Sequence, residues 1–265
     1  MRTVIVSVAL AVLLLIPPSQ SIAEIDEATV EAMWLFDDGG GNVLEDLSGH
    51  GRDGDLEGGT EWTDGRFGGG LKLDGSTGEV VITGYKGIGG TTPRTTVLWY
   101  KTDRPGDQRL VCWGANVNTQ KYHVRLHEAP TALRVETQGG QLFATEPDLV
   151  DDEWHHLAVV LPPGSTMCHD HLLYVDGVQI KNTGGNNIGV NTDVTQNDVE
   201  IGYNKWIKHG NYAPGTFDEV AIFSVALSAA DINAIMNLGL SGAASVSAKG
   251  KLATKWGQLK SDSAR

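Results

Sequence analysis

A carboxylate lies inside an apolar strand near the end of this 265-residue sequence. In the run GTFDEVAIF (215–223), Asp218 shares its two-residue period with Val220 and Ile222, two side chains that favour burial. An unpartnered buried carboxylate is costly, so three surroundings suit it: a strand end open to water, a hydrogen-bonded partner or a cation. Asp218 is therefore a candidate metal ligand.

Aromatic rings beside polar groups are the composition that sugar binding needs, and two stretches have it. In KYHVRL (121–126), His123 and Arg125 share one face of the expected strand, and Tyr122 lies on the other. Tyr122 and Arg125 are candidate ligand-binding residues, although an aromatic residue in such a strand can equally fill the core.

The second stretch is a polar loop that carries aromatic residues. Tyr203, Asn204 and Trp206 fall within it, and His209 and Tyr212 follow. A sugar stacks on an exposed ring, so Trp206 is the strongest single candidate, with Tyr203 and Asn204 beside it.

Catalytic carboxylates are not paired in this sequence. Glycosidases need two positioned carboxyl groups, but Glu136 stands alone in ALRVET (132–137), and the acidic residues 151–153 fall in an expected turn. The glycine clusters open no helix, so they form neither a phosphate loop nor a dinucleotide fingerprint. We therefore predict no catalytic residues and no enzyme, with a glycan-active hydrolase or lyase as the alternative.

The first 23 residues have the composition of a secretory signal peptide. Arg2 precedes the apolar run VIVSVALAVLLLIP, and the small-residue site Ser21-Ile22-Ala23 follows. The run is shorter than the roughly twenty apolar residues of a membrane span. We expect cleavage near Ala23 and a secreted, extracellular or periplasmic protein without membrane insertion. The net charge of −13 makes nucleic acid a poor partner.

Two cysteines, Cys112 and Cys168, are the only ones in the sequence. An exported chain meets oxidising conditions, in which two cysteines can pair, but spacing does not show whether their Cα atoms approach. We predict a Cys112–Cys168 disulfide on the condition that the strand RLVCWG (109–114) and the entry to HLLYVDG (171–177) are neighbours.

Short strands separated by Gly and Asp-Gly turn signals account for most of the sequence. This pattern is typical of a β-sandwich or a barrel. The predicted strands cover 30–36, 70–75, 79–84, 95–102, 109–114, 121–126, 132–137, 153–161, 171–180, 198–203 and 215–223.

Only one segment has a helical pattern. Ser228 and Asp231 form a capping pair ahead of a stripe of apolar residues, which predicts a short helix over 228–237. No internal repeat or second core is visible. We divide the chain into a signal peptide (1–23), one domain (27–238) and a weakly ordered C-terminal tail (239–265).

Five stretches, taken in order, resemble the successive signatures of the laminin-G-like jelly-roll family, part of the concanavalin-A-like lectin and glucanase group. They are MWLFDDGGGNVLEDLSGHGRDGDL, WTDGRFGGGLKLDGSTGEVVI, DEWHHLAVVL, LLYVDGVQI and GTFDEVAIFSVALSAADI. The resemblance implies an all-β fold, a two-sheet antiparallel jelly-roll sandwich with one short C-terminal helix. Many members of the family bind glycans or proteins, and many bind calcium.

The resemblance also implies a calcium ion that ties the first strand to the last. The matching positions are Asp37, at the end of MWLFDD, and Asp218 in GTFDEV, with a backbone carbonyl from the glycine turn around Gly69. Calcium accepts about six to eight oxygen ligands, a set that carboxylates, carbonyls and water provide. Both carboxylates can instead face water or accept hydrogen bonds from turns.

These features together predict a secreted, non-enzymatic module that recognises an extracellular glycan or protein, with calcium as a structural cofactor. The alternative is a glycan-active enzyme of the concanavalin-A-like class. A third interpretation is a structural adhesion domain that binds no small ligand. Each interpretation uses the same sandwich, so the choice among them depends on the site.

Overall fold

The computed structural model describes residues 25–127, 132–144, 147–205 and 211–244. The predicted signal peptide (1–23), the candidate residue Trp206 and positions 245–265 of the predicted tail lie outside these ranges. None of the helices within them has the length and apolar composition needed to cross a membrane.

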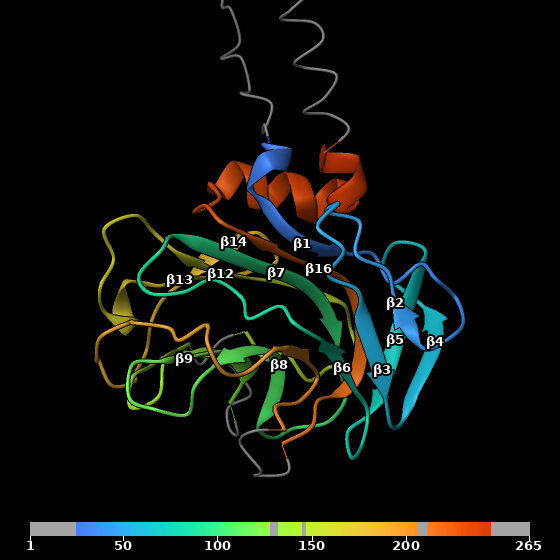
Figure 1. Ribbon diagram of the computed structural model, residues 1–265, viewed down its shortest axis with the longest axis horizontal. Helices are drawn as coiled ribbons and strands as arrows, with labels where there is room; N and C mark the ends of the chain where they lie inside the picture. The colour runs from blue at the N-terminus through green and yellow to red at the C-terminus, as the bar shows by residue number, and fades with distance from the viewer. Residues whose placement is uncertain (1–24, 128–131, 145–146, 206–210, 245–265) are drawn as a thin grey trace, which may run out of the picture.

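Two antiparallel sheets form the fold, and Figure 1 shows β7, β12 and β16 of one sheet above β8 and β9 of the other. Sheet A contains, in spatial order, β14 (Val178–Ile180), β13 (Leu172–Val175), β12 (His155–Leu161), β7 (Arg94–Lys101), β16 (Pro214–Phe223), β5 (Gly69–Asp74) and β4 (Thr60–Asp64). Its eighth strand, β1 (Val30–Trp34), also pairs with β16 and follows the short 3-10 helix η1 (Glu27–Thr29).

Sheet B also has eight strands in the described residues. In spatial order they are β11 (Gln141–Phe143), β10 (Leu133–Glu136), β9 (Lys121–Leu126), β8 (Gln108–Gly114), β15 (Val199–Ile201), β6 (Glu79–Ile82), β3 (Gly54–Glu57) and β2 (Val43–Leu44). A second 3-10 helix, η2 (Cys168–Asp170), precedes β13. The two-sheet antiparallel jelly-roll sandwich predicted from the sequence is confirmed.

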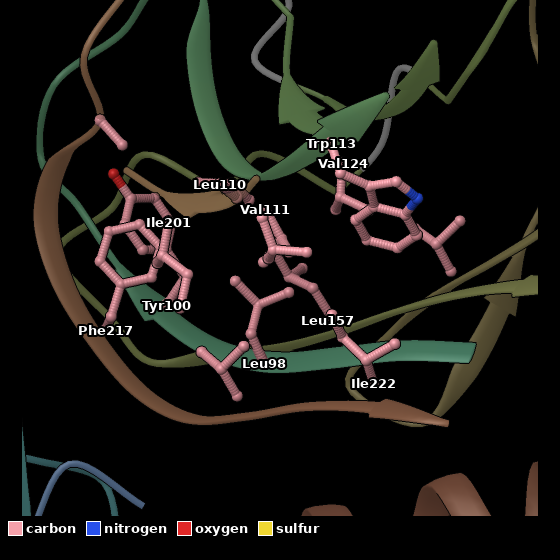
Figure 2. Packing of buried hydrophobic residues seen from close by; sticks show 14 of the residues in the cluster. Leu98, Tyr100, Leu110, Val111, Trp113, Val124, Leu157, Ile201, Phe217 and Ile222 are labelled. Carbon is pink, nitrogen blue, oxygen red and sulfur yellow. The ribbon is translucent and has the colours of Figure 1, made fainter. Parts of the chain in front are cut away.

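Apolar side chains fill the space between the two sheets. Leu98, Tyr100 and Phe217 point inward from sheet A, and Val111 and Trp113 point inward from sheet B, as Figure 2 shows. The rings of Tyr100 and Phe217 lie 4.6 Å apart between centroids. Alternation along each strand turns one set of residues into this core and leaves the other set on the outer face of its sheet.

Strand β16 lies in the middle of sheet A and changes partner along its length. One edge pairs with β7 throughout, whereas the other edge pairs first with β5 and then with β1. The register to β7 shifts between Asp218 and Ala221, and Glu219 has a positive φ of 53°. This bulge breaks the two-residue period that the sequence predicts: Phe217 faces the same core as Val220, and Asp218 does not share their direction.

The helix at residues 229–244 covers the outer face of sheet A, above β1 and β16 in Figure 1. Asp231 N–H donates to Ser228 Oγ at 3.2 Å, and Ser228 N–H donates to Asp231 Oδ2 at 2.9 Å, so the predicted cap is confirmed. Ile232 and Ile235 are fully buried against this sheet. Gly239 has a φ of 72°, a left-handed conformation that favours glycine. The helical residues continue to 244, beyond the end at 237 that the sequence predicts.

We predict that Phe217→Ala lowers the free energy of unfolding by about 3–5 kcal/mol, because it leaves a cavity beside Tyr100 at the centre of the sandwich. Urea denaturation followed by tryptophan fluorescence measures the loss. Val178→Ala is the control, since Val178 is 66% exposed, and we expect it to change stability by less than about 0.5 kcal/mol. Similar losses for the two variants would contradict this placement of Phe217.

Candidate functional site

The outer face of sheet B is charged over its three neighbouring strands β8, β9 and β10. Because the apolar residues of β9 point into the core, Lys121, His123 and Arg125 project from the opposite face. The strand register sets Arg109 of β8 opposite Arg125, and Glu136 of β10 opposite His123. Charged residues from three strands therefore meet on one surface.

This surface contains a polar pocket of about 280 Å³. Two carboxylates, three cationic side chains and three amide side chains line it: Asp107, Glu136, Arg109, Lys121, Arg125, Asn116, Gln138 and Asn211. Such a lining offers both donors and acceptors of hydrogen bonds, the requirement for recognising a polar ligand.

Glu136 joins the cations of the pocket. Lys121 Nζ donates to Glu136 Oε1 at 2.6 Å, Arg125 Nη1 donates to Oε2, and Arg134 Nη2 lies 3.4 Å from Oε2. Burial raises the pKa of the Glu136 carboxyl, but the charges of Lys121 and Arg125 lower it by more, so its pKa lies below the usual value. Glu136 is ionised at neutral pH.

Asp107 holds Arg125 from the other side. Arg125 Nε donates to Asp107 Oδ1 at 2.7 Å, and Nη2 pairs with Oδ2. Asn211 Nδ2 donates to the same Oδ2 at 2.8 Å. A guanidinium held by two carboxylates is fixed in one orientation. The predicted ligand-binding residue Arg125 thus lines the pocket, with its donors directed at Asp107 and Glu136.

Two further carboxyl groups lie buried on the next strands of sheet B, β15 and β6. Glu200 is fully buried and Glu79 nearly so, and each has one carboxyl oxygen without a hydrogen-bond partner within the described ranges. Burial and the charge of Glu79 raise the pKa of Glu200 to about 8, although Lys205 N–H donates to Glu200 Oε2 at 3.0 Å. Glu200 is therefore mainly protonated at neutral pH.

Two of the predicted ligand-binding residues, Tyr203 and Asn204, are buried. Tyr203 is only 7% exposed and stacks on Tyr212, with ring centroids 3.7 Å apart and planes inclined by 6°. Asn204 is fully buried. Trp206 lies outside the described residues, so its predicted role stays a prediction.

Tyr122 is a core residue and not part of the outer face. Its ring packs against Trp113 with centroids 4.1 Å apart, and its hydroxyl lies 3.3 Å from Thr96 Oγ1. The alternation that exposes Arg125 turns Tyr122 inward, which corrects its assignment as a ligand-binding residue. Arg109 and Lys121 were not identified as pocket residues from the sequence. Lys121 could have been found, because it lies on the same face of the strand KYHVRL as His123 and Arg125.

The residues predicted to hold calcium meet at the turn between β4 and β5. Gly69 N–H donates to Asp37 Oδ1 at 2.6 Å, and Asp218 Oδ2 accepts from the backbone N–H groups of Arg66 and Phe67 at 2.7 and 2.8 Å. The other oxygen, Asp218 Oδ1, is buried without a hydrogen-bond partner in the described part of the chain. Burial, then the charges of Glu219 and Asp37, raise the pKa of Asp218 to about 8.

The carboxylate and carbonyl oxygen atoms at this turn are the kind of ligand that a hard cation such as calcium prefers. Gly65 lies so close that an added Cβ would meet Asp218 Oδ2 at 2.7 Å, and an added Cβ on Gly69 would meet the Phe36 carbonyl oxygen at 2.6 Å. No group of three or more His, Cys, Asp or Glu side chains in the described residues is arranged to hold a metal. A calcium ion here would therefore rely on Asp37, Asp218, backbone carbonyls and water.

Both cysteines are free and buried. Cys112 lies on β8 opposite Glu200 and His123, whereas Cys168 belongs to the core cluster between the sheets. The predicted disulfide is not formed: the strand RLVCWG belongs to sheet B, whereas HLLYVDG leads into β13 of sheet A. Burial raises the pKa of the Cys168 thiol to about 11.

Residues 74–233 match the family model Laminin_G_3, described as the concanavalin A-like lectin/glucanases superfamily. The chain belongs to this family. The matched residues include β6 to β16 and hence the whole polar pocket. The laminin-G-like resemblance of the sequence is thereby confirmed. Among curated proteins, no sequence matches the chain.

Solved structures of similar fold include binding domains and enzymes. Domain 4 of AbnA, a GH43 extracellular arabinanase from Geobacillus stearothermophilus, in complex with arabinotriose, is 20% identical with a TM-score of 0.57; the match covers 77% of this chain and 97% of that one. The binding domain of botulinum neurotoxin DC in complex with SialylT is 12% identical with a TM-score of 0.56, and the match covers 80% of this chain and 51% of that one.

A third similar structure is the Trypanosoma rangeli sialidase in complex with a difluoro-KDN ligand. It is 17% identical with a TM-score of 0.57, and the match covers 87% of this chain but only 36% of that one. At these identities the similarity establishes the fold. The functions of the three proteins differ, so the role of this chain must be argued from its own site.

We predict that Glu200→Gln stabilises the protein increasingly as pH rises. Folding raises the pKa of Glu200 from 4.5 to about 8. The protonated carboxyl is therefore compatible with burial below about pH 4.5, and the folded state loses stability relative to the unfolded state as pH rises from there toward 8. Melting temperatures from pH 4 to 9 should diverge in favour of the variant across this window. Glu61→Gln on exposed β4 is the control and should show no such divergence; parallel curves for Glu200→Gln would contradict the prediction.

Proposed function

We propose that this protein is a secreted, non-enzymatic module that binds an extracellular glycan or protein through the polar pocket on the outer face of sheet B. The observation that carries the proposal is the convergence of fixed charges and amide groups from separate strands and loops on one pocket. The signal-peptide composition of residues 1–23 supports secretion.

The ionisation of the pocket favours binding over catalysis. A glycosidase needs one carboxyl group that still holds a proton at the working pH. Glu136 and Asp107 are both paired with Arg125, and the pKa of Glu136 is lowered. Neither suits the role of a general acid, and both suit the role of acceptors for sugar or peptide groups.

The similar structures support a binding role without fixing the ligand. One was solved with arabinotriose and another with SialylT, and both are described as domains of larger proteins. A glycan-active enzyme is the alternative, and Glu200 favours it because its pKa is raised to about 8 and Glu79 lies on the adjacent strand. The complete burial of Glu200 opposes this alternative, since a general acid must reach its substrate.

We predict that Asn116→Trp abolishes ligand binding because the indole fills the pocket. Asn42→Trp, an equally large change on an exposed loop before β2, is the control and should bind as the wild type does. A glycan array and a pull-down of extracellular proteins measure binding. Equal binding by both variants would place the ligand elsewhere, and release of reducing sugar that Glu200→Gln abolishes would establish an enzyme instead.

We also propose that calcium stabilises the fold at the turn between β4 and β5. Asp37 of the segment after β1 and Asp218 of β16 would hold it. Asp218 Oδ1, which has no hydrogen-bond partner among the described residues, supports this assignment. A bound cation would neutralise the Asp218 carboxylate, whose ionisation is otherwise opposed by burial and by the nearby charges of Glu219 and Asp37.

We predict that calcium raises the melting temperature of the wild type and leaves that of Asp218→Asn unchanged. A site that binds only the folded state adds about 2.7 kcal/mol at a hundredfold excess over its dissociation constant. Thermal melts in calcium and in chelator measure the effect. Asp103→Asn, at an exposed position after β7, should respond as the wild type does; equal midpoints for the wild type in both conditions would contradict the proposal.

A further inference from the structure

Three arginines lie in one row across the outer face of sheet B. Arg134 of β10 is directly opposite Arg125 of β9, and Arg125 is directly opposite Arg109 of β8. Like charges directly opposite each other on neighbouring strands destabilise a sheet. The row therefore requires negative charge above it.

Two carboxylates of the described residues supply negative charge to the row. Asp107 and Glu136 bind Arg125, and Glu136 also lies beside Arg134 and Lys121. Among the described residues that line the pocket, two are carboxylates and three are cations, so one positive charge is in excess. This excess is localised within a chain whose net charge is −13.

Arg109 is the cation of the pocket that has no carboxylate partner among the described residues. Its side chain is only 3% exposed, and its Nε and Nη1 atoms are buried without a hydrogen-bond partner in the described part of the chain. Leaving charged donors buried and unpaired is strongly unfavourable. Arg109 also lines the polar pocket, so a ligand that enters it deeply would lie against the guanidinium.

We propose that the pocket binds the carboxylate of an acidic sugar residue, of the uronic acid or sialic acid class, with Arg109 as its anchor. This inference rests on the proposed function and adds the chemical class of the ligand. A carboxylate matches the planar fork of a guanidinium and can accept two parallel hydrogen bonds from it. It would supply a negative charge beside Arg109.

The rest of the pocket suits the neutral part of a sugar. Asn116, Gln138 and Asn211 carry amides that both donate to and accept from hydroxyl groups. The volume of about 280 Å³ is just below the usual lower bound of about 300 Å³ for a pocket that holds a drug-sized ligand. One residue of a longer glycan would enter it, with the remainder outside.

The two carboxylates of the pocket also limit which anions fit. Asp107 and Glu136 would repel a ligand that carries several charges close together. A single carboxylate on Arg109 leaves the site near neutrality, whereas a polysulfated segment adds charge that the pocket cannot match. We therefore expect carboxylated sugars to bind and heparin-like sulfated chains to bind less well.

Isothermal titration calorimetry tests the inference with two matched pairs of oligosaccharides. Trigalacturonate is compared with its methyl ester, and sialyllactose with lactose, so the two pairs also distinguish a uronic acid from a sialic acid. We expect one of the acidic sugars to bind at least tenfold more tightly than its neutral counterpart, which corresponds to about 1.4 kcal/mol. Raising the salt concentration should weaken this binding.

Three variants locate the binding. Arg109→Gln should abolish the preference for the acidic sugar, and Arg109→Lys should restore it only in part because a lysine lacks the planar fork. Lys72→Gln, an equal change of charge on exposed β5 of sheet A, should bind as the wild type does. The melting temperature of Arg109→Gln should be unchanged or higher, since the variant removes an unpaired buried charge; a loss of folding would instead show that Arg109 is structural.

Failure of the inference and failure of the proposed function give different results. Equal binding of the acidic and neutral sugars, blocked by Asn116→Trp, would overturn the anionic ligand class and leave the binding module standing. Binding of the acidic sugar that survives both Arg109→Gln and Asn116→Trp would place the site elsewhere and overturn both. Absence of binding to either acidic sugar, with another ligand found on the array, would overturn the inference alone.

Discussion

The change of partner along β16 is the constraint on which sheet A depends. The strand must pair with β7 on one edge while the other edge passes from β5 to β1. The bulge at Asp218 and Glu219 accommodates the shift in register to β7, and it requires a strained left-handed backbone conformation at Glu219. Glu219 then accepts a hydrogen bond from Leu240 N–H, so the same bulge also fixes the C-terminal helical segment. The first strand, the last strand and the closing helix are all joined there.

Alternation in β8, β9 and β10 links the core to the pocket. Each inward residue such as Tyr122 or Trp113 fixes the outward direction of its neighbours, so the packing of the core positions the charges of the outer face. The charged side chains are held further by mutual ion pairs on a rigid sheet rather than on loops. A preorganised polar surface of this kind loses little conformational entropy when a ligand binds.

The fold was predictable from the sequence because strand alternation, turn residues and the cap at Ser228 act locally. The bulge was not, because one extra residue between two pairing partners leaves the composition of GTFDEVAIF unchanged. The pocket was predictable only at Arg125, since the role of Arg109 depends on its register to Arg125, which long-range pairing sets. Tyr122 shows the opposite case. Its aromatic ring suits sugar stacking, but its position in the two-residue alternation of β9 turns the ring into the core.

The two ends of the described domain lie on the same side of the molecule, opposite the pocket. Ile25 belongs to the same apolar cluster as Leu240 and Ala243 of the helical segment on the outer face of sheet A, whereas the pocket opens on the outer face of sheet B. Any polypeptide or surface joined at either end would thus approach sheet A. A tethered molecule would present its pocket outward, and several copies fixed side by side would point their pockets in one direction, an arrangement that allows simultaneous engagement of one extended polymer.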